Sequence, residues 1–237
     1  MKVNLFGVEF DQVTLTEAVS RIDKMIQTAG FHQVATMNPE YLVRAREDQR
    51  LALAIAKMDL VVADGVGVTL ASRLKGFGRL ERIRGGDLVE ALAELSVKKG
   101  YKVGLIGAGR GVGQRALTVL QKKHPGLQGF SHPTRFGAIR LMKKEKPQIV
   151  LTALGFQGPV WLEKLREEKL NLVGLEVGGV FNYLAGISRR PGRIITGAGL
   201  EWLWRLVWEP WRVRRQLALL KFLRFALILK PQQPKDR

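Results

Sequence analysis

Short apolar runs that alternate with amphipathic stretches constrain the fold of this chain more than any other feature. Helix-type spacing of apolar residues fills most of the sequence between the runs, which lie at 31–36, 59–63, 102–106, 149–153 and 172–177. In proteins with this alternation the strands pair in parallel and the helices between them cover the sheet. The sequence therefore predicts an α/β fold: a Rossmann-like, mostly parallel sheet with helices on both faces.

Local start signals place the first helices. Residues 14–17, Thr-Leu-Thr-Glu, form a capping box that opens a helix to about residue 29. Asn38-Pro39-Glu40 supplies an N-cap, a first-turn proline and an acid that suits the positive end of the helix dipole. We expect one uninterrupted helix from there to about Lys57. Further helices are expected over about 67–76, 87–99 and 113–124.

The C-terminal segment differs in character from the rest of the chain. It holds four of the five tryptophans, at positions 202, 204, 208 and 211, with arginines between them. Tryptophan favours the boundary between water and lipid, and arginine binds lipid phosphates. Lys221 and Arg224 interrupt the apolar sequence that follows, so no run reaches the roughly 18–20 residues of a membrane span. We therefore expect a helical appendage that docks on a membrane surface. The alternative is a Trp-rich helical hairpin that packs on its own domain or on a second copy in a homo-oligomer.

Charge is concentrated in the same segment. The net charge is +18, and residues 189–237 carry twelve Lys or Arg against three acidic residues, which is half of the excess. An anionic membrane surface is the expected partner, rather than nucleic acid, because the basic residues of nucleic-acid binders are not usually joined to a Leu/Phe/Ile face. We expect an α/β core over 1–195, the appendage over 196–230 and a disordered tail over 231–237.

The composition indicates the cellular compartment of the protein and which cofactors to expect. The chain has no cysteine, which is compatible with a reducing cytoplasm, and residues 1–7 lack the apolar region of a signal peptide. We expect a peripheral protein on the cytoplasmic face of the cell membrane. The three histidines are scattered and no Asp-x-Asp sequence occurs, so we expect no metal and no other cofactor.

Polar residues follow three of the predicted strands. Thr36 and Asn38 follow the first, Asp64 the second, and a glycine-rich stretch, 107–113, the third. Ligands of open parallel sheets bind beyond the carboxyl ends of the strands, where a carboxylate such as that of Asp64 can act as a general base. Each position also has a structural explanation: Asn38 as an N-cap, Asp64 as a turn or cap residue, and the glycines as a strand–helix turn instead of a phosphate-binding loop.

Several motifs occur together in an order that resembles one protein family. They are Thr36-Met-Asn38, Ala63-Asp-Gly-Val-Gly67, Glu81-Arg82 with Gly85 and Asp87, Gly178-Gly-Val-Phe181, and Gly199-Leu-Glu-Trp-Leu203 with Arg205, Glu209-Pro210 and Arg212. Over nearly its whole length the chain resembles the WecG/TagA/CpsF glycosyltransferases, glycosyltransferase family 26. The C-terminal signature, Leu-Glu-Trp-Leu with the following Arg, Glu-Pro and Arg, is the most specific part.

The resemblance implies an inverting, metal-independent enzyme. It would move an N-acetylmannosamine-type sugar from a UDP donor to polyprenyl-diphosphate-linked N-acetylglucosamine, for a cell-surface polymer such as teichoic acid. It implies Asp64 as the general base, Thr36 and Asn38 as groups that orient the sugar or nucleotide, and Arg82 as an arginine near the leaving diphosphate. It also implies that the lipid diphosphate is held by cations of the appendage, notably Arg212, Arg214 and Arg215.

One stretch departs from the family pattern. After the strand at 149–153 the family usually has Gly-x-Pro-Lys-Gln-Glu, whereas this chain has Gly155-Phe-Gln-Gly-Pro-Val160. Gln157 could supply one polar contact. A cleft built to hydrogen-bond a sugar loses discrimination when such groups are missing. The donor sugar therefore stays open, and a second hypothesis is a family member without catalysis that binds the lipid-linked precursor or partner enzymes as a scaffold.

Overall fold

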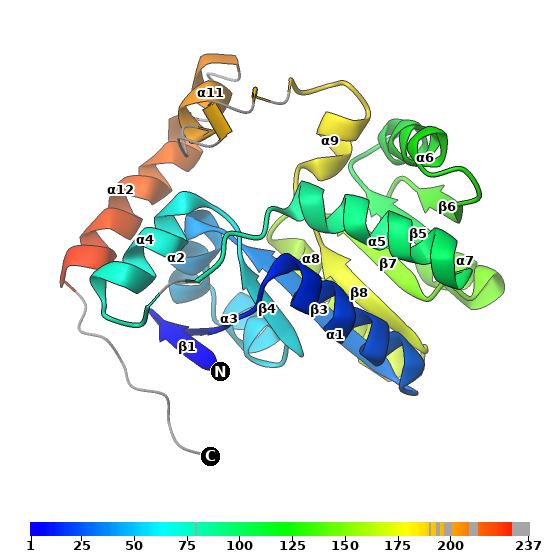
Figure 1. Ribbon diagram of the computed structural model, residues 1–237, viewed down its shortest axis with the longest axis horizontal. Coiled ribbons are helices and arrows are strands. Elements are labelled where there is room, and N and C mark those ends of the chain that lie inside the picture. Colours follow the sequence, from blue (N-terminus) through cyan, green and yellow to red (C-terminus); the bar gives the residue numbers. More distant parts are fainter. Residues whose placement is uncertain (79, 190, 193–194, 197–200, 209–212, 229–237) are drawn as a thin grey trace.

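Six parallel strands form the central sheet of the protein, seen in a computed structural model (Figure 1). Their order across the sheet is β4-β3-β8-β7-β5-β6, and every neighbouring pair is parallel. The strands are β3 (Phe31–Met37), β4 (Leu60–Ala63), β5 (Lys102–Gly107), β6 (Gln128–His132), β7 (Ile149–Ala153) and β8 (Leu172–Glu176). The arrangement confirms the predicted α/β fold.

The structure describes most of the chain: residues 1–78, 80–189, 191–192, 195–196, 201–208 and 213–228, without the side chains of 205 and 213–217. The expected disordered tail, 231–237, lies outside the described residues.

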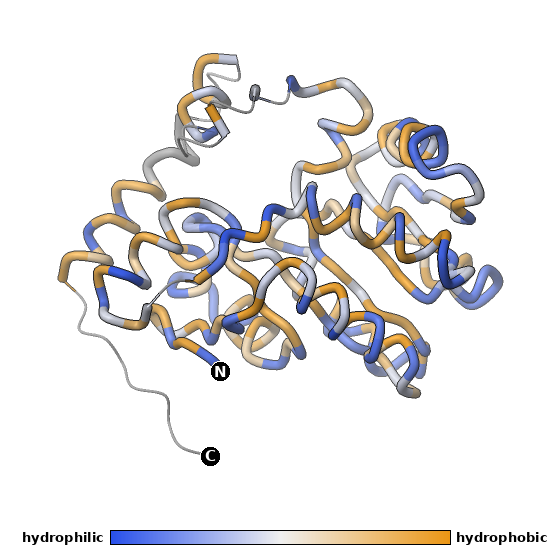
Figure 2. The backbone as a smooth tube through the Cα atoms, in the orientation of Figure 1, coloured by the Kyte–Doolittle hydropathy of each residue, from blue (hydrophilic) through white to orange (hydrophobic). Residues whose placement is uncertain are grey.

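Helices cover both faces of the sheet because successive strand residues point to opposite sides. Val34 packs in one core cluster and Ala35 in another, so one strand supplies both faces. Hydrophobic residues recur along the strands and along the helices that cover them (Figure 2). The first cluster takes residues from α1 (Leu15–Gln27), α5 (Gly85–Lys99), α6 (Val112–Lys123) and α9 (Val180–Leu184). The opposite face is covered by α2 (Pro39–Glu47), α3 (Gln49–Ala56), α4 (Val66–Leu74), α7 (Ala138–Glu145), α8 (Gln157–Lys164) and the short 3₁₀ helix η1 (Leu165–Glu168).

The helix expected from Asn38 to Lys57 is instead two helices, α2 and α3. Asp48 lies between them with an extended backbone, and its carboxylate accepts hydrogen bonds from Arg50 N–H (3.1 Å) and Leu51 N–H (3.3 Å). An aspartate that satisfies the first N–H groups of a helix favours a new start there. The prediction of one helix was wrong because this cap outweighs the continuous helical spacing.

An N-terminal hairpin precedes the sheet and was not expected from the sequence. It consists of β1 (Lys2–Leu5) and β2 (Val8–Asp11), which pair antiparallel. The buried carboxylate of Asp11 accepts a hydrogen bond from Val61 N–H in β4 (3.0 Å) and pairs with Arg21 of α1 (2.9 Å). The hairpin is therefore tied to the edge of the sheet that carries β4.

The C-terminal appendage contains α11 (Glu201–Trp208) and α12 (Val213–Ile228). The inner face of α12 packs on the core through buried Phe222 and Ala226, and Phe222 meets Phe6 edge-to-face at 5.6 Å. The outer face leaves a set of apolar side chains exposed, namely Leu220, Leu223, Leu227 and Ile228. Within the described part of the chain, no helix has both the length and the hydrophobicity to span a bilayer.

Candidate active site

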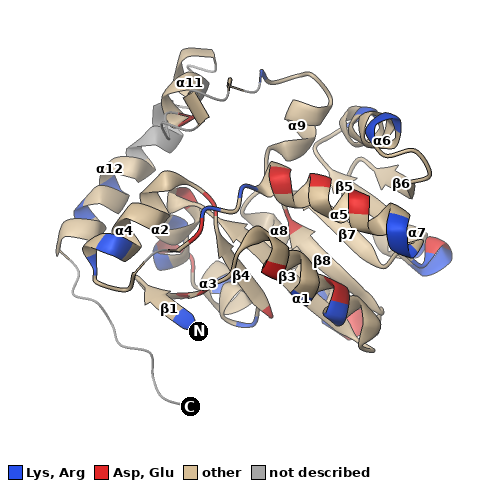
Figure 3. Ribbon diagram, in the orientation of Figure 1, with Lys and Arg blue, Asp and Glu red and all other residues tan. Residues whose placement is uncertain are grey.

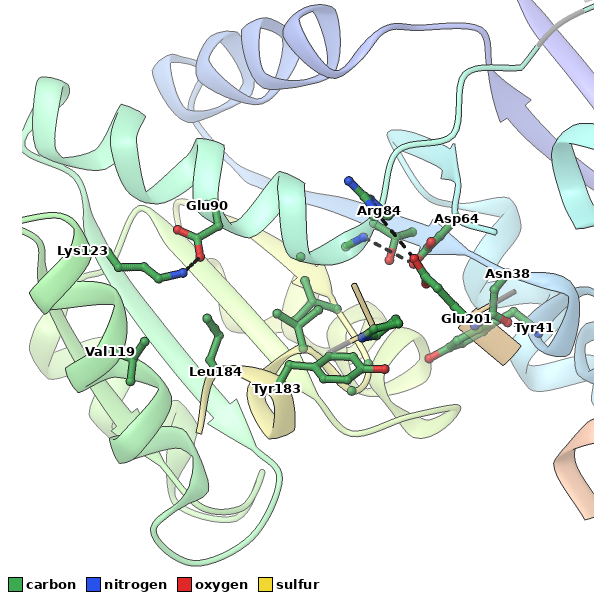
Figure 4. Close-up of a pocket in the computed structure, with 18 residues that line it drawn as sticks. Asn38, Tyr41, Asp64, Arg84, Glu90, Val119, Lys123, Tyr183, Leu184 and Glu201 are labelled. Atoms are coloured by element: carbon green, nitrogen blue, oxygen red, sulfur yellow. Dashed lines mark hydrogen bonds and ion pairs between the residues drawn. The ribbon is translucent and has the colours of Figure 1, made fainter. Parts of the chain in front are cut away.

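A cavity of about 340 Å³ lies at the carboxyl ends of β3, β4 and β8 (Figure 4). The strand ends contribute Thr36, Asn38, Asp64 and the turn 177–179. The cavity continues between α5, α6 and α9, and its lining includes Glu201 of α11. Three predicted residues that are up to 28 positions apart in the sequence thus meet at one edge of the sheet.

Asp64 directly follows β4 and faces the start of α5. Its backbone N–H bonds to the carbonyl of Met37 (2.8 Å), which extends the pairing of β3 and β4 by one residue. Its Oδ2 accepts a hydrogen bond from the N–H of Gly85, the first residue of α5 (3.3 Å). Gly65, not Asp64, is the N-cap of α4. The carboxylate is therefore held by a neighbouring helix and lines the cavity, where it can meet a substrate hydroxyl.

Thr36 and Asn38 each combine a structural contact with a place in the cavity lining. The Asn38 side chain accepts hydrogen bonds from Glu40 N–H (2.9 Å) and Tyr41 N–H (3.2 Å), so it is the N-cap of α2. The buried Thr36 hydroxyl donates to the carbonyl of Glu176 (3.5 Å). The N-cap explanation of Asn38 is confirmed, and its predicted role as a substrate ligand stays a prediction.

Arg84, which sequence reasoning did not select, lines the cavity, whereas Arg82 does not. Arg84 Nε pairs with Asp87 (2.5 Å) and Nη1 with Glu201 (3.9 Å). Arg82 lies beside it, with Nη2 on Glu201 (2.9 Å) and Nη1 on the Thr196 carbonyl (3.0 Å). The sequence did contain a signal for Arg84. In an extended segment every second side chain points to the same side, so Arg84 shares the side of Arg82, opposite buried Ile83.

The far end of the cavity carries a second charged group that the sequence did not indicate (Figure 4). Glu90 of α5 pairs with Lys123 (2.5 Å) and with Nε2 of His124 (2.9 Å). Burial alone would raise the pKa of Glu90, but hydrogen bonds from Lys123 and His124 hold it below its usual range. The cavity thus extends from Asp64 at one end to the Glu90–Lys123 pair at the other.

Other predicted ligands lie elsewhere. Gln157 is bonded to Arg135 (2.6 Å), and neither residue lines the cavity; nor do residues 107–113, which follow β5. Arg212 lies outside the described residues. Arg214 and Arg215 belong to α12, but their side chains are not among those described. The structure therefore does not bring Gln157 or residues 107–113 together with Asp64, and the predicted roles of the three arginines stay predictions.

Glu176, the last residue of β8, is a buried carboxyl group directly beside the cavity. Burial raises its pKa to about 7, although hydrogen bonds from Thr152 and from backbone N–H groups favour the charged form. The folded protein therefore binds a proton more tightly at this site than the unfolded chain, whose glutamates titrate near pH 4.5.

This pKa predicts how stability depends on pH. The contribution of Glu176 to the free energy of unfolding is fully present below pH 4.5 and is lost as the pH rises through 7. Between about pH 5 and pH 8 the loss should reach about 2–3 kcal/mol. The side chain of Glu176→Gln cannot titrate. Its free energy of unfolding, measured by urea denaturation at these two pH values, should therefore change less between them than that of the parent protein. A constant difference between variant and parent across this range would contradict the prediction.

Comparison with known proteins places the chain in a family. A sequence model of the Glycosyl transferase WecG/TagA/CpsF family matches residues 3–236. The chain belongs to this family. The match runs from the N-terminal hairpin through α12, so the appendage is part of the family pattern. The resemblance drawn from the motifs is confirmed, and the protein is a glycosyltransferase.

Several similar bacterial proteins share one name, N-acetylglucosaminyldiphosphoundecaprenol N-acetyl-beta-D-mannosaminyltransferase. A protein from Staphylococcus aureus (strain MRSA252) is 26% identical over 231 residues, which cover 94% of this chain and 91% of the relative. A protein from Bacillus subtilis (strain 168) is 26% identical over 208 residues, 85% of this chain and 80% of the relative. One from Bacillus spizizenii is 27% identical over 225 residues, 91% and 87% respectively.

Proposed function

We propose that this glycosyltransferase moves an N-acetyl-β-D-mannosaminyl group from a UDP donor to polyprenyl-diphosphate-linked N-acetylglucosamine at a membrane surface, in the synthesis of a cell-wall polymer such as teichoic acid. The names of the similar proteins support the acceptor and the transferred sugar. The observation that carries the proposal is Asp64, a carboxylate at the carboxyl end of the sheet that lines a cavity together with Arg84 (Figure 4). The UDP donor is our inference.

Asp64 would act as the general base. It takes the proton from the acceptor hydroxyl while the hydroxyl oxygen attacks the anomeric carbon of the donor sugar. The bond between that carbon and the UDP oxygen breaks, and UDP leaves from the opposite side, which inverts the configuration. Thr36 and Asn38, which line the same cavity, would orient the sugar. No covalent enzyme intermediate is required.

The charge that develops on the departing UDP needs positive groups near it. Arg84 lines the cavity beside Gly85 and Gly86, which begin α5, and Arg82 lies next to it through shared Glu201. A guanidinium group can form two parallel hydrogen bonds to one phosphate, and helix N-termini also attract anions. We therefore propose that Arg84, supported by Arg82, replaces a metal ion at the diphosphate. Among the residues that the structure describes, no group of three or more His, Cys, Asp or Glu could hold a metal ion.

The arginine assignment makes a prediction. Arg84→Gln should raise the KM for the sugar nucleotide by about tenfold to a hundredfold, because a charge-assisted hydrogen bond to the diphosphate is lost. Arg82→Gln should have a smaller effect, since Arg82 does not line the cavity. Arg50→Gln, on the exposed side of α3, is the matched control. Equal effects of all three substitutions would contradict the assignment.

The membrane part of the proposal rests on the appendage. The outer face of α12 exposes Leu220, Leu223 and Leu227, and Lys and Arg residues lie along α12 and neighbouring α4 (Figure 3). Apolar side chains with cations beside them bind anionic lipid surfaces. We place the enzyme peripherally on the cytoplasmic face, where its lipid-linked acceptor would meet the cavity.

One observation favours a second candidate function. The Lys-Gln-Glu triplet usual in the family is missing between Gly155 and Val160. Such a chain could bind the lipid-linked precursor as a scaffold without transferring sugar.

The deciding experiment measures UDP release by purified protein from UDP-N-acetylmannosamine, with a lipid-diphosphate N-acetylglucosamine acceptor, with and without EDTA. Acceptor-dependent release that EDTA does not reduce would support the transferase and its independence from metal. Loss of release in EDTA would overturn the metal-free mechanism. No release from folded, vesicle-binding protein with any UDP-sugar tested would favour the scaffold.

A further inference from the structure

The carboxylate of Glu176 connects two turns beside the cavity. Its Oε1 accepts hydrogen bonds from Gly155 N–H (3.2 Å) and Gly178 N–H (3.0 Å). Its Oε2 accepts from Leu154 N–H (3.3 Å) and from the Thr152 hydroxyl (2.6 Å). Leu154 and Gly155 follow β7, and Gly178 follows β8. One side chain thus ties together the carboxyl ends of two neighbouring strands.

Gly158, in the first turn of α8, leaves the space that this carboxylate occupies. A Cβ atom on Gly158 would lie 1.8 Å from Oε2 of Glu176, a distance at which the two cannot coexist. The carboxylate of Glu176 therefore fits in its place only because residue 158 has no side chain.

Of the two turns, the one after β8 reaches the cavity. Residues 177–179, which directly follow Glu176, line it, and the Glu176 carbonyl accepts the hydrogen bond from Thr36, also in the lining. Gly178 has a positive φ of 55°, a backbone conformation that side-chain-bearing residues rarely adopt. The hydrogen bond from Gly178 N–H to the carboxylate holds this turn, so a change at residue 176 should move the cavity wall without touching Asp64 directly.

We propose that Glu176 is a positioning residue of the sugar-nucleotide site: its carboxylate fastens the turn after β8, which forms one wall of the cavity, to the turn after β7, and Gly158 leaves the space that this requires. The identity of the ligand rests on the proposed function. The role of Glu176 in holding the turns does not, and it can be measured separately.

Amide hydrogen exchange tests whether the Glu176 carboxylate holds the two turns. In Glu176→Gln the side chain presents an NH₂ group in place of one acceptor oxygen, so at least one turn N–H loses its partner. Peptides that contain residues 154–155 and 178 should exchange at least about tenfold faster than in the parent protein. Glu94→Gln, an exposed glutamate on α5, is the matched control. Unchanged exchange at both turns would overturn the proposal.

Kinetics test the effect on the site. Glu176→Gln should raise the KM for UDP-N-acetylmannosamine by about tenfold and leave kcat within about threefold, because the wall moves and the base stays. An unchanged KM in a variant that turns over would overturn the positioning role. If the parent protein itself does not turn over, the proposed function fails, and the exchange experiment then decides the role of Glu176 alone.

A pair of substitutions tests the link to Gly158. Gly158→Ala should lower the Tm by about 5 °C or more in the parent protein, because the new methyl group displaces the carboxylate. In a Glu176→Ala background the same change should have little effect. Equal losses in the two backgrounds would show that residues 158 and 176 are not coupled and would overturn this part of the proposal.

Discussion

Asp64→Asn should lower kcat by about 10²–10⁴-fold, the range expected when a general base is lost. The amide cannot accept a proton from the acceptor hydroxyl, but it keeps the size of the carboxylate and can still accept the hydrogen bond from Gly85 N–H. The Tm and the KM for the sugar nucleotide should therefore change little. UDP release under saturating substrates, together with thermal unfolding, measures both parts of this expectation.

A matched control exists in the same chain. Asp48 caps α3 and does not line the cavity, and Asn is as good an N-cap as Asp, so Asp48→Asn should keep normal turnover. A rate for Asp64→Asn close to that of the parent would remove Asp64 as the base. A loss of kcat accompanied by a fall in Tm would point to a structural role instead.

Replacing the outer leucines of α12 by serine should lower the partition of the protein onto anionic vesicles by about 10³-fold. Leu220, Leu223 and Leu227 follow helical spacing on one face and are 64%, 55% and 78% exposed. Each leucine that enters the lipid contributes about 1.5 kcal/mol, and the sum sets the expected loss. Co-sedimentation with vesicles that contain anionic lipid, at fixed ionic strength, measures it.

This substitution is cleaner than removal of the segment. Phe222 and Ala226 on the inner face are buried against the core, so deletion from residue 199 onward would also uncover apolar core surface. Leu53→Ser, at another exposed leucine on α3, is the matched control and should bind vesicles normally. If the α12 variant sediments as well as this control, the outer face of α12 is not the membrane contact, and self-association becomes the alternative to test.

The parts of the fold that depend on local patterns could be predicted from the sequence. The buried strands correspond to short apolar runs, and Asn38-Pro39 predicts the start of α2. Strand β6 was missed because it lies at the edge of the sheet and its sequence, Gln-Gly-Phe-Ser-His, lacks an apolar run. The hairpin 2–11 was missed for a similar reason: its strands, Lys-Val-Asn-Leu and Val-Glu-Phe-Asp, alternate apolar and polar residues and contain no apolar run.

Some residues of the candidate site could likewise be predicted from the sequence, and others could not. Thr36, Asn38 and Asp64 could be found because they follow predicted strands, and the carboxyl ends of parallel strands share one edge. The Glu90–Lys123 pair could not be found, because its members lie 33 positions apart on two helices. Glu176 looked like one more strand residue, and its role depends on the missing side chain of Gly158.

By itself, the sequence determined the alternation of strands and helices, the family and the candidate base, since each rests on short local motifs and on their order along the chain. Only the tertiary structure decided the strand order, the entry of Arg84 in place of Arg82 into the cavity, and which face of α12 packs inward. The physical reason is that these features depend on contacts between distant segments. Their energies come from burial and charge pairing, which exist only once the chain has folded.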